Sequence, residues 1–286
     1  MKTIEVNESP SLAATFFRAL GTGGKRPGLV SSLSKQTLVL PKVMLDAQHI
    51  ARYAALCGFK PEQGVPLIYP QMLTFPLVTA YFLSDACPWP AMGTVHLANH
   101  IQQFRALHAG DMVRVELETG GLFAHEKGQV FTLDLRILRG DELVWSATQS
   151  LLRVGVKETT GAPYASQIVA DAPLSCQTEF GATADIGRRY GAVSGDRNPI
   201  HMSALSAKLF GFKRAIAHGM WTNARALSCL LPSTPLEQGT LAVEFKTPLY
   251  LPGRASLWSA RSDDGAFFEV RDAKGQKPHL RGQLSY

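Results

Sequence analysis

The alternation of apolar and polar residues follows the same order of elements twice along the chain. In the first part, Gln36–Val43 has a strand pattern and Leu45–Cys57 an amphipathic helical pattern. Met72–Leu83 is apolar nearly all round, and a helix of that kind has to be buried. Residues 95–154 then alternate apolar and polar positions between turn signals, which is typical of antiparallel strands. We therefore expect a curved sheet to wrap around the helix at Met72–Leu83.

The same order recurs in the last part of the chain. A strand at Gln177–Thr183 is followed by short helices at Ala184–Val193 and Ser203–Phe210 and by an apolar helix at His218–Leu231, after which strand patterns close the sequence. A long helix wrapped by a curved antiparallel sheet, occurring twice, indicates an α+β double hotdog fold. Each sheet would leave an open edge, and pairing the two halves edge to edge removes it.

These patterns divide the chain into four parts. They are an N-terminal extension (1–33), a first hotdog repeat (34–154), a linker rich in small and polar residues (155–174) and a second hotdog repeat (175–286). The extension contains a short helical pattern at Ser11–Leu20. It also contains the run GTGGKRPG, which lacks the spacing of a phosphate-binding loop, so we expect a mobile connector there.

Composition narrows the class of protein. The 286 residues are 45% hydrophobic and 18% charged, which permits a substantial core. Glu5 and Glu8 stand where a signal peptide would need an apolar run, and no stretch is long enough for a membrane span, so we expect a soluble cytoplasmic protein. The net charge of +6 is dispersed, which argues against nucleic acid and favours a small phosphate-bearing ligand. The four scattered cysteines are expected to be buried free thiols.

The stretch from Tyr190 to Met220 holds the candidate chemistry. Asp196 and His201 lie on either side of Asn198-Pro199, which forces a turn, so their side chains could converge on one point. A carboxylate and an imidazole that share a water molecule can transfer protons in both directions. Addition or elimination of water across a double bond needs such a pair.

A second feature lies a few residues further on, where His218-Gly219 opens the apolar helix. The free amides of a helix's first turn carry partial positive charge and would polarise a thioester carbonyl, as an oxyanion hole does. Glycine at this position lets a ligand approach the backbone closely.

The runs YGAVSGDRNPIH, AKLFGF and IAHGM resemble the hydratase-2 motif of MaoC-like R-specific enoyl-thioester hydratases and dehydratases. The runs PLIYPQMLTFPLV and MGTVHLANHIQQFR resemble the N-terminal half of tandem-hotdog members. The resemblance implies that Asp196 and His201 are the catalytic pair and that the Gly219 amide binds the thioester oxygen. It assigns supporting roles to Gly195, Asn198 and His218. Ser203 stands where many relatives carry Asp or Asn, and it can still cap the following helix.

The first half has no D-x-N-P-x-H at the equivalent point, where it reads CGFKPEQGVPLIYP, so we expect one active site per chain. The freed space beside Met72–Leu83 could hold an acyl chain, and larger side chains at Leu73 or Val78 would then fill it. His96 and His100 lie on a strand pattern without further ligands at useful spacing, so we expect packing or polar-rim roles and no metal.

The resemblance, together with this pair, implies reversible conversion between trans-2-enoyl and (3R)-3-hydroxyacyl thioesters, with no metal and no redox cofactor. It leaves open the chain length, the direction in the cell, coenzyme A or acyl carrier protein as the carrier, and whether two chains form a homodimer. Candidate phosphate contacts are Lys208, Lys213, Arg214 and Lys246. The alternatives are a non-catalytic acyl-thioester-binding protein and a hotdog thioesterase, which would want a carboxylate on the long helix, where only Asn223 is found.

Overall fold

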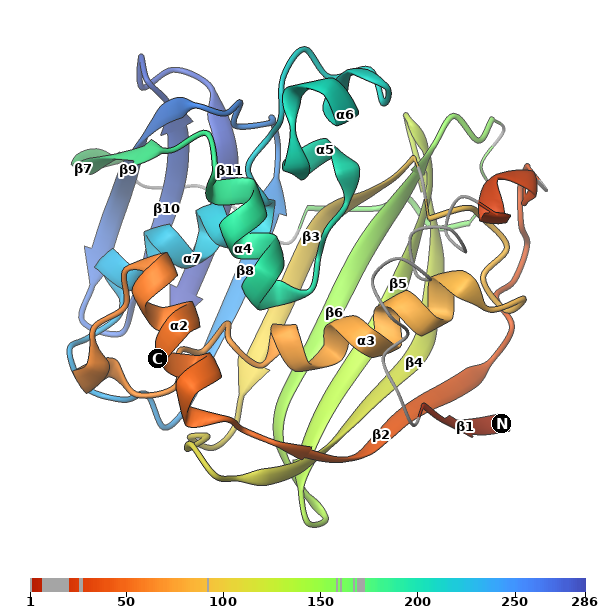
Figure 1. Cartoon of the computed structure of the whole chain (residues 1–286), viewed down its shortest axis with the longest axis horizontal. Helices are drawn as coiled ribbons and strands as arrows, with labels where there is room; N and C mark the ends of the chain where they lie inside the picture. The colour runs from red at the N-terminus through yellow and green to blue at the C-terminus, as the bar shows by residue number, and fades with distance from the viewer. Residues whose placement is uncertain are drawn as a thin grey trace.

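The structure is a computed structural model, which describes residues 2–6, 21–25, 28–91, 93–157, 159, 161–166, 168 and 173–286. Within these residues, 11 strands form one sheet in the order β1-β2-β4-β5-β6-β3-β8-β11-β10-β9-β7. The sheet curves around the long helices, as Figure 1 shows. The helix expected at Ser11–Leu20 lies outside the described residues.

The first half contributes one side of the sheet, and its short strand β1 (Lys2–Glu5) pairs in parallel with β2. Its other elements are β2 (Gln36–Met44), α2 (Ala47–Cys57), α3 (Gln71–Leu83), β3 (Thr94–Gln103), β4 (Met112–His125), β5 (Gly128–Arg139) and β6 (Glu142–Val154), with 3-10 turns η1 (Thr22–Gly24) and η2 (Pro61–Gln63).

The second half repeats this arrangement with more short helices. Its elements are β7 (Ser175–Ala182), α4 (Ile186–Ser194), α5 (Pro199–Met202), α6 (Ala204–Lys208), α7 (Gly219–Leu230), β8 (Gly239–Phe245), β9 (Gly253–Ser262), β10 (Gly265–Asp272) and β11 (Pro278–Ser285). Each half has the same strand order around one long helix, α3 or α7, which confirms the double hotdog fold.

The two halves join along β3 and β8. These strands pair antiparallel from Ala98 opposite Glu244 to Gln103 opposite Gly239. The pairing satisfies backbone groups that either half would leave exposed at its own edge. The predicted edge-to-edge association of the repeats is therefore confirmed.

Helix α3 has two apolar faces with different surroundings. Leu77 and Tyr81 are fully buried on the face that packs into the core. Phe75, Thr79 and Phe82 are only partly buried and border a cavity. The helix is apolar nearly all round because the core and the cavity both require apolar side chains.

Helix α2 of the first half is fastened to helices of the second half. The His49 ring lies between the Tyr69 hydroxyl and the main-chain oxygen of Val193 at the end of α4, at 2.8 Å from each. On α7, Arg225 donates to the Cys57 oxygen at 2.9 Å. These contacts hold α4 against the first repeat. Helix α4 leads into the loop of residues 195–198, which carries Asp196 and is called the motif loop below.

Tyr164, Ser166 and Ile168 of the linker lie on the sheet face that points away from α3 and α7. The Tyr164 amide donates to the Ala124 oxygen at 2.8 Å, and the Ser166 hydroxyl bonds to the Glu244 carboxylate. Tyr164 and His100 border a small hollow there between β3, β6 and β8. The linker therefore covers the junction of the two halves from outside.

All four cysteines are free, but only two are buried. Cys57 and Cys87 lie in the core, whereas Cys176 on β7 and Cys229 near the end of α7 are exposed. The expectation of four buried thiols was wrong for the latter two, because apolar periodicity does not fix which side of an edge strand or a helix end is covered. None of the helices in the described residues has the length and apolar character needed to cross a bilayer.

Candidate active site

The loop after α4 presents Asp196. Gly195 ends the helix in the left-handed region with φ 80°, which glycine adopts without steric cost. The Asn198 amide donates to Asp196 Oδ1 at 3.1 Å, and Asn198 Oδ1 accepts from the Ile200 amide at 3.3 Å, capping α5. Gly195 and Asn198 therefore shape the backbone, and the second carboxylate oxygen, Oδ2, stays outside this loop network.

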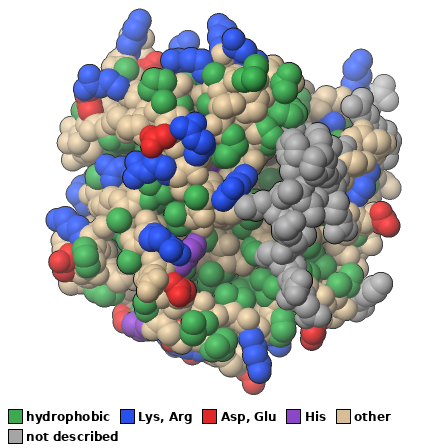
Figure 2. All heavy atoms as spheres, in the orientation of Figure 1, with side chains coloured by type: hydrophobic (Ala, Val, Ile, Leu, Met, Phe, Trp, Pro, Cys, Tyr) green, Lys and Arg blue, Asp and Glu red, His purple; other side chains and the backbone are tan. Residues whose placement is uncertain are grey.

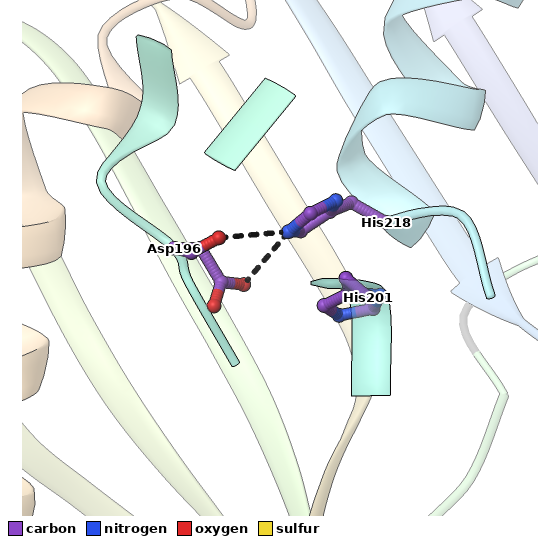
Figure 3. A group of neighbouring side chains, drawn as sticks. All are labelled: Asp196, His201 and His218. Atoms are coloured by element: carbon purple, nitrogen blue, oxygen red, sulfur yellow. Dashed lines mark hydrogen bonds and ion pairs between the residues drawn. The ribbon is translucent and has the colours of Figure 1, made fainter. Parts of the chain in front are cut away.

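His201 on α5 meets this carboxylate from the other side of the turn. The ring is 8% exposed, and its Nδ1 lies 2.8 Å from the Ile216 carbonyl oxygen, to which it donates. That bond leaves the Nε2 lone pair free. Ligand atoms of Asp196, His201 and His218 all lie within 4.8 Å of one another. Figure 3 draws these three side chains. The predicted pair thus converges closely enough to share one water molecule.

His218 fixes the position of the Asp196 loop. Its ring is 3% exposed, and its Nε2 donates to the Asp196 main-chain oxygen at 2.9 Å. The same nitrogen lies 3.8 Å from Asp196 Oδ2, as the dashed lines in Figure 3 show. The ring also stacks on His201, with 3.7 Å between centroids. His218 therefore contacts both members of the pair.

Burial keeps both imidazoles neutral. Desolvation lowers the pKa of His201, and the nearby Asp196 carboxylate offsets only part of that effect. Desolvation also lowers the pKa of His218 to about 3, with a further contribution from His201. At neutral pH, His201 is therefore available as a base rather than as a cation.

The buried His218 predicts a loss of stability in acid. Its pKa of about 3 in the folded chain lies below the ordinary value of 6.5, so the unfolded chain binds more protons between these values. Unfolding free energy should then fall as the pH drops below about 6.5, by on the order of 2–3 kcal/mol at pH 4 for His218. Denaturant titrations of the parent and of His218→Gln would test this, because the variant should lack that part of the slope. The exposed His108 supplies the control His108→Gln, which should keep the parent slope.

The N-terminus of α7 faces the same space. His218 is the N-cap and Gly219 the first helical residue, so the Gly219 amide has no partner four residues earlier in the helix. A Cβ on Gly219 would lie 2.6 Å from Cδ1 of Phe245. Close packing against Phe245, rather than a left-handed conformation, therefore requires glycine here.

One cavity of about 490 Å³ contains all of these groups. Its wall comes from both halves of the chain, with α3, β3 and β6 from the first and the motif loop, α5, α7 and β8 from the second. A volume of this size, largely apolar with a few convergent polar groups, is typical of a small-molecule site. Of the four candidate phosphate contacts, Lys246 borders the cavity and pairs with Glu244, whereas Lys208, Lys213 and Arg214 are exposed outside it.

His96 is a cavity residue that the sequence did not reveal as one. Its ring borders the cavity and lies 4.8 Å from Phe245, whereas His100 lies under the linker on the other face of the sheet. A register shift in β3 between His96 and Ala98 reverses the alternation, so two histidines four residues apart face opposite sides. Desolvation lowers the pKa of His96 to about 4.

The three convergent side chains belong to residue types that can bind a metal ion. Among the described residues, Asp196, His201 and His218 form the group of His, Cys, Asp or Glu side chains that lie close enough to hold one metal ion. His218 Nε2 carries the proton donated to the Asp196 oxygen, so its lone pair is not available on that side. Two ligands then remain, fewer than the three protein ligands of a typical catalytic zinc. The donor set therefore fits an acid–base pair better than a metal.

Comparison with known proteins shows the family of this chain. The profile described as MaoC like domain matches residues 167–280. The chain is 34% identical to 3-hydroxyacyl-thioester dehydratase X of Mycobacterium tuberculosis over 249 residues, covering 87% of this chain and 88% of that protein.

Solved structures agree with this result. A crystal structure of HtdX from M. tuberculosis has a TM-score of 0.73 at 31% identity, covering 87% of this chain and 98% of that one. A conserved M. tuberculosis protein described as a double hotdog shares the fold, with a TM-score of 0.53 at 13% identity, covering 90% and 96%. The chain therefore belongs to the MaoC-like dehydratase family.

Proposed function

We propose that this protein is a hydro-lyase that reversibly adds water to trans-2-enoyl thioesters to give (3R)-3-hydroxyacyl thioesters. The observation that carries the proposal is the convergence of Asp196 and His201, within 4.8 Å, beside the amide end of α7 in one apolar cavity. The name of the M. tuberculosis relative, 3-hydroxyacyl-thioester dehydratase X, describes the same class of reaction.

The pair would act on one water molecule. His201 Nε2 takes a proton from the water as its oxygen bonds to the β-carbon, while Asp196 Oδ2 accepts the other hydrogen bond and orients the molecule. The resulting enolate takes a proton at the α-carbon from the same pair, so no net proton is gained or lost. The reverse sequence eliminates water. The α-proton is the one that His201 took from the water, delivered directly or passed on through the Asp196 carboxylate, and no metal, redox cofactor or prosthetic group takes part.

The negative charge that develops on the thioester oxygen would be stabilised by the Gly219 amide. A first-turn amide combines a free N–H with the positive end of the helix dipole. The group is fixed before the substrate binds, so no reorganisation is needed during the reaction. Coenzyme A or the phosphopantetheine arm of a carrier protein enters as part of the substrate.

The acyl chain would extend along α3 of the first half. Val78 and Phe82 border the cavity on that side, and the first repeat has no catalytic loop to occupy the space. Leu73, which the sequence suggested as a second filling position, packs against the core instead of bordering the cavity. Val78 is therefore the position at which to test the idea.

Val78→Phe should shorten the range of accepted acyl chains. The larger ring would occupy part of the apolar cavity, so kcat/KM for a long enoyl thioester should fall about tenfold or more, given roughly 0.8 kcal/mol per methylene group displaced. Activity with the four-carbon crotonyl thioester should stay within about twofold. Val78→Ala is the matched control and should not lose long chains. Equal effects on all chain lengths would contradict this placement of the acyl chain.

Loss of ultraviolet absorbance from crotonyl-coenzyme A tests the reaction itself. The purified protein should remove the conjugated double bond without releasing thiol, and should do so equally well after treatment with EDTA. Release of thiol would instead indicate a thioesterase. Stable absorbance together with measurable binding would indicate a non-catalytic acyl-thioester-binding protein.

The arrangement on α7 weighs against the thioesterase. Asn223, the polar residue that the sequence offered for that chemistry, is fully buried and does not border the cavity. A pure binding protein, in turn, would have no need for a neutral imidazole beside a carboxylate. The hydro-lyase therefore remains the function that uses the residues present.

A further inference from the structure

Helix α6 carries an apolar surface that the proposed reaction does not use. Leu205 is 76% exposed and Leu209 is 78% exposed, more than any other large hydrophobic residue in the described part of the chain. Leu205 lies on α6 and Leu209 directly follows its last residue, and the two side chains form a small apolar patch. Isolated exposed leucines are common, but a pair with this much exposure beside a binding cavity indicates a contact surface.

The chain segment that carries this patch is basic. Between Arg197 and His218 the sequence contains four Lys or Arg residues and no Asp or Glu. All four, Arg197, Lys208, Lys213 and Arg214, are exposed. Figure 2 shows hydrophobic and basic side chains gathered at the top of the view, where Figure 1 places α6. We call Leu205, Leu209 and these four residues the α6 patch.

The segment that carries the α6 patch lies next to the catalytic cavity. The Ser206 hydroxyl donates to the Pro199 oxygen at 2.7 Å, which fastens α6 to α5, the helix that carries His201. Ser203 caps α6 by accepting from the Ser206 amide at 3.0 Å. Arg197 and Phe212, on either side of this segment, both border the cavity. Anything bound to the patch would therefore sit next to the cavity wall formed by Arg197 and Phe212.

We propose that the α6 patch is the docking surface for a small acidic acyl carrier protein, which presents the thioester to the cavity; this rests on the proposed hydro-lyase function. Two leucines on a basic chain segment match a partner surface on which acidic side chains surround an apolar one. The phosphates of coenzyme A would use the cations but would gain nothing from the leucines.

A second copy of the same chain fits this surface less well. In a two-fold symmetric dimer the patch would face itself, so its four cations would oppose four others without a carboxylate between them. Like charges placed against each other at an interface are unfavourable. An acidic partner instead neutralises these charges.

Parallel kinetics with crotonyl-carrier protein and crotonyl-coenzyme A test the proposal. Leu205→Gln with Leu209→Gln should raise KM for the carrier-protein substrate about tenfold, since apolar residues central to an interface contribute most of its binding energy. Lys208→Glu with Lys213→Glu should have a similar effect and remove most of the dependence on salt. With crotonyl-coenzyme A, kcat/KM should stay within about twofold in the leucine variant, whereas the lysine variant should also bind the phosphates of coenzyme A less tightly.

Met44 and Met112 supply the matched control. They are 56% and 52% exposed and lie opposite each other on β2 and β4, in the first repeat. Met44→Gln with Met112→Gln should leave both substrates unaffected.

Three results would overturn the docking surface. The first is unchanged carrier-protein kinetics in the α6 variants, and the second is an equal loss with coenzyme A in the leucine variant. The third is a change in oligomeric state by light scattering in the leucine variant, which would assign the patch to a second copy. In each case, activity of the parent protein with crotonyl-coenzyme A would still support the hydro-lyase function. Its absence would refute that function separately.

Discussion

Replacement of Asp196 by Asn or of His201 by Gln is expected to lower kcat for enoyl-thioester hydration by about a thousandfold, within the range for loss of a general acid–base group. Asn at position 196 keeps an oxygen that can accept from the Asn198 amide, now 3.1 Å from Oδ1, so the loop should stay in place. Gln at position 201 removes the imidazole lone pair that takes the water proton. The measurement is the initial rate of absorbance loss from crotonyl-coenzyme A at saturating substrate.

Two checks separate chemistry from folding in this experiment. Thermal melting should show both variants folded, although His201→Gln loses the bond to the Ile216 oxygen. His100→Gln is the matched control, because His100 lies on the opposite face of the sheet, under the linker, and does not border the cavity. Variants at 196 and 201 that turn over enoyl thioesters as fast as the parent would refute the assignment of the pair.

Gly219→Ala is expected to lower kcat/KM by about a hundredfold, mainly through kcat, as loss of an oxyanion-hole donor does. The added methyl group would lie 2.6 Å from the Phe245 ring, so either the ring or the first turn of α7 has to move. A shift of the turn misdirects the amide, and a shift of Phe245 disturbs the cavity wall and its contact with His96. Steady-state kinetics with crotonyl-coenzyme A, with kcat and KM resolved, would measure the effect.

Gly181→Ala provides the comparison for this variant. Gly181 lies on β7, is exposed, and a Cβ there would meet nothing within 4 Å. It should therefore retain parent kinetics. If Gly219→Ala also retained them, the thioester oxygen would have to be held by another group.

The elements with strong periodicity were predictable from the sequence. Met72–Leu83 and His218–Leu231 correspond to α3 (Gln71–Leu83) and α7 (Gly219–Leu230) because burial on the sheet imposes a long apolar pattern. The convergence of Asp196 and His201 was predictable for a different reason. Turn residues between them fix the local backbone, so little long-range information is needed.

Features set by distant contacts were not predictable. The bulge in β3 turns His96 toward the cavity, whereas the simple spacing from His100 places both on one face. Gly187 was not singled out, yet a Cβ on it would lie 2.0 Å from the His201 oxygen, so glycine is needed for α4 to approach α5. Each depends on a neighbour that cannot be identified from local pattern.

The antiparallel seam between β3 and β8 has a consequence for dividing the chain. A fragment limited to residues 175–286 would keep Asp196, His201 and Gly219 but would expose the whole hydrogen-bonding edge of β8. It would also lose the α3 side of the cavity and the contacts that α2 makes to α4 and α7. Such a fragment should self-associate through its free edge. The first repeat thus acts as a permanent partner subunit, supplied within the same polypeptide.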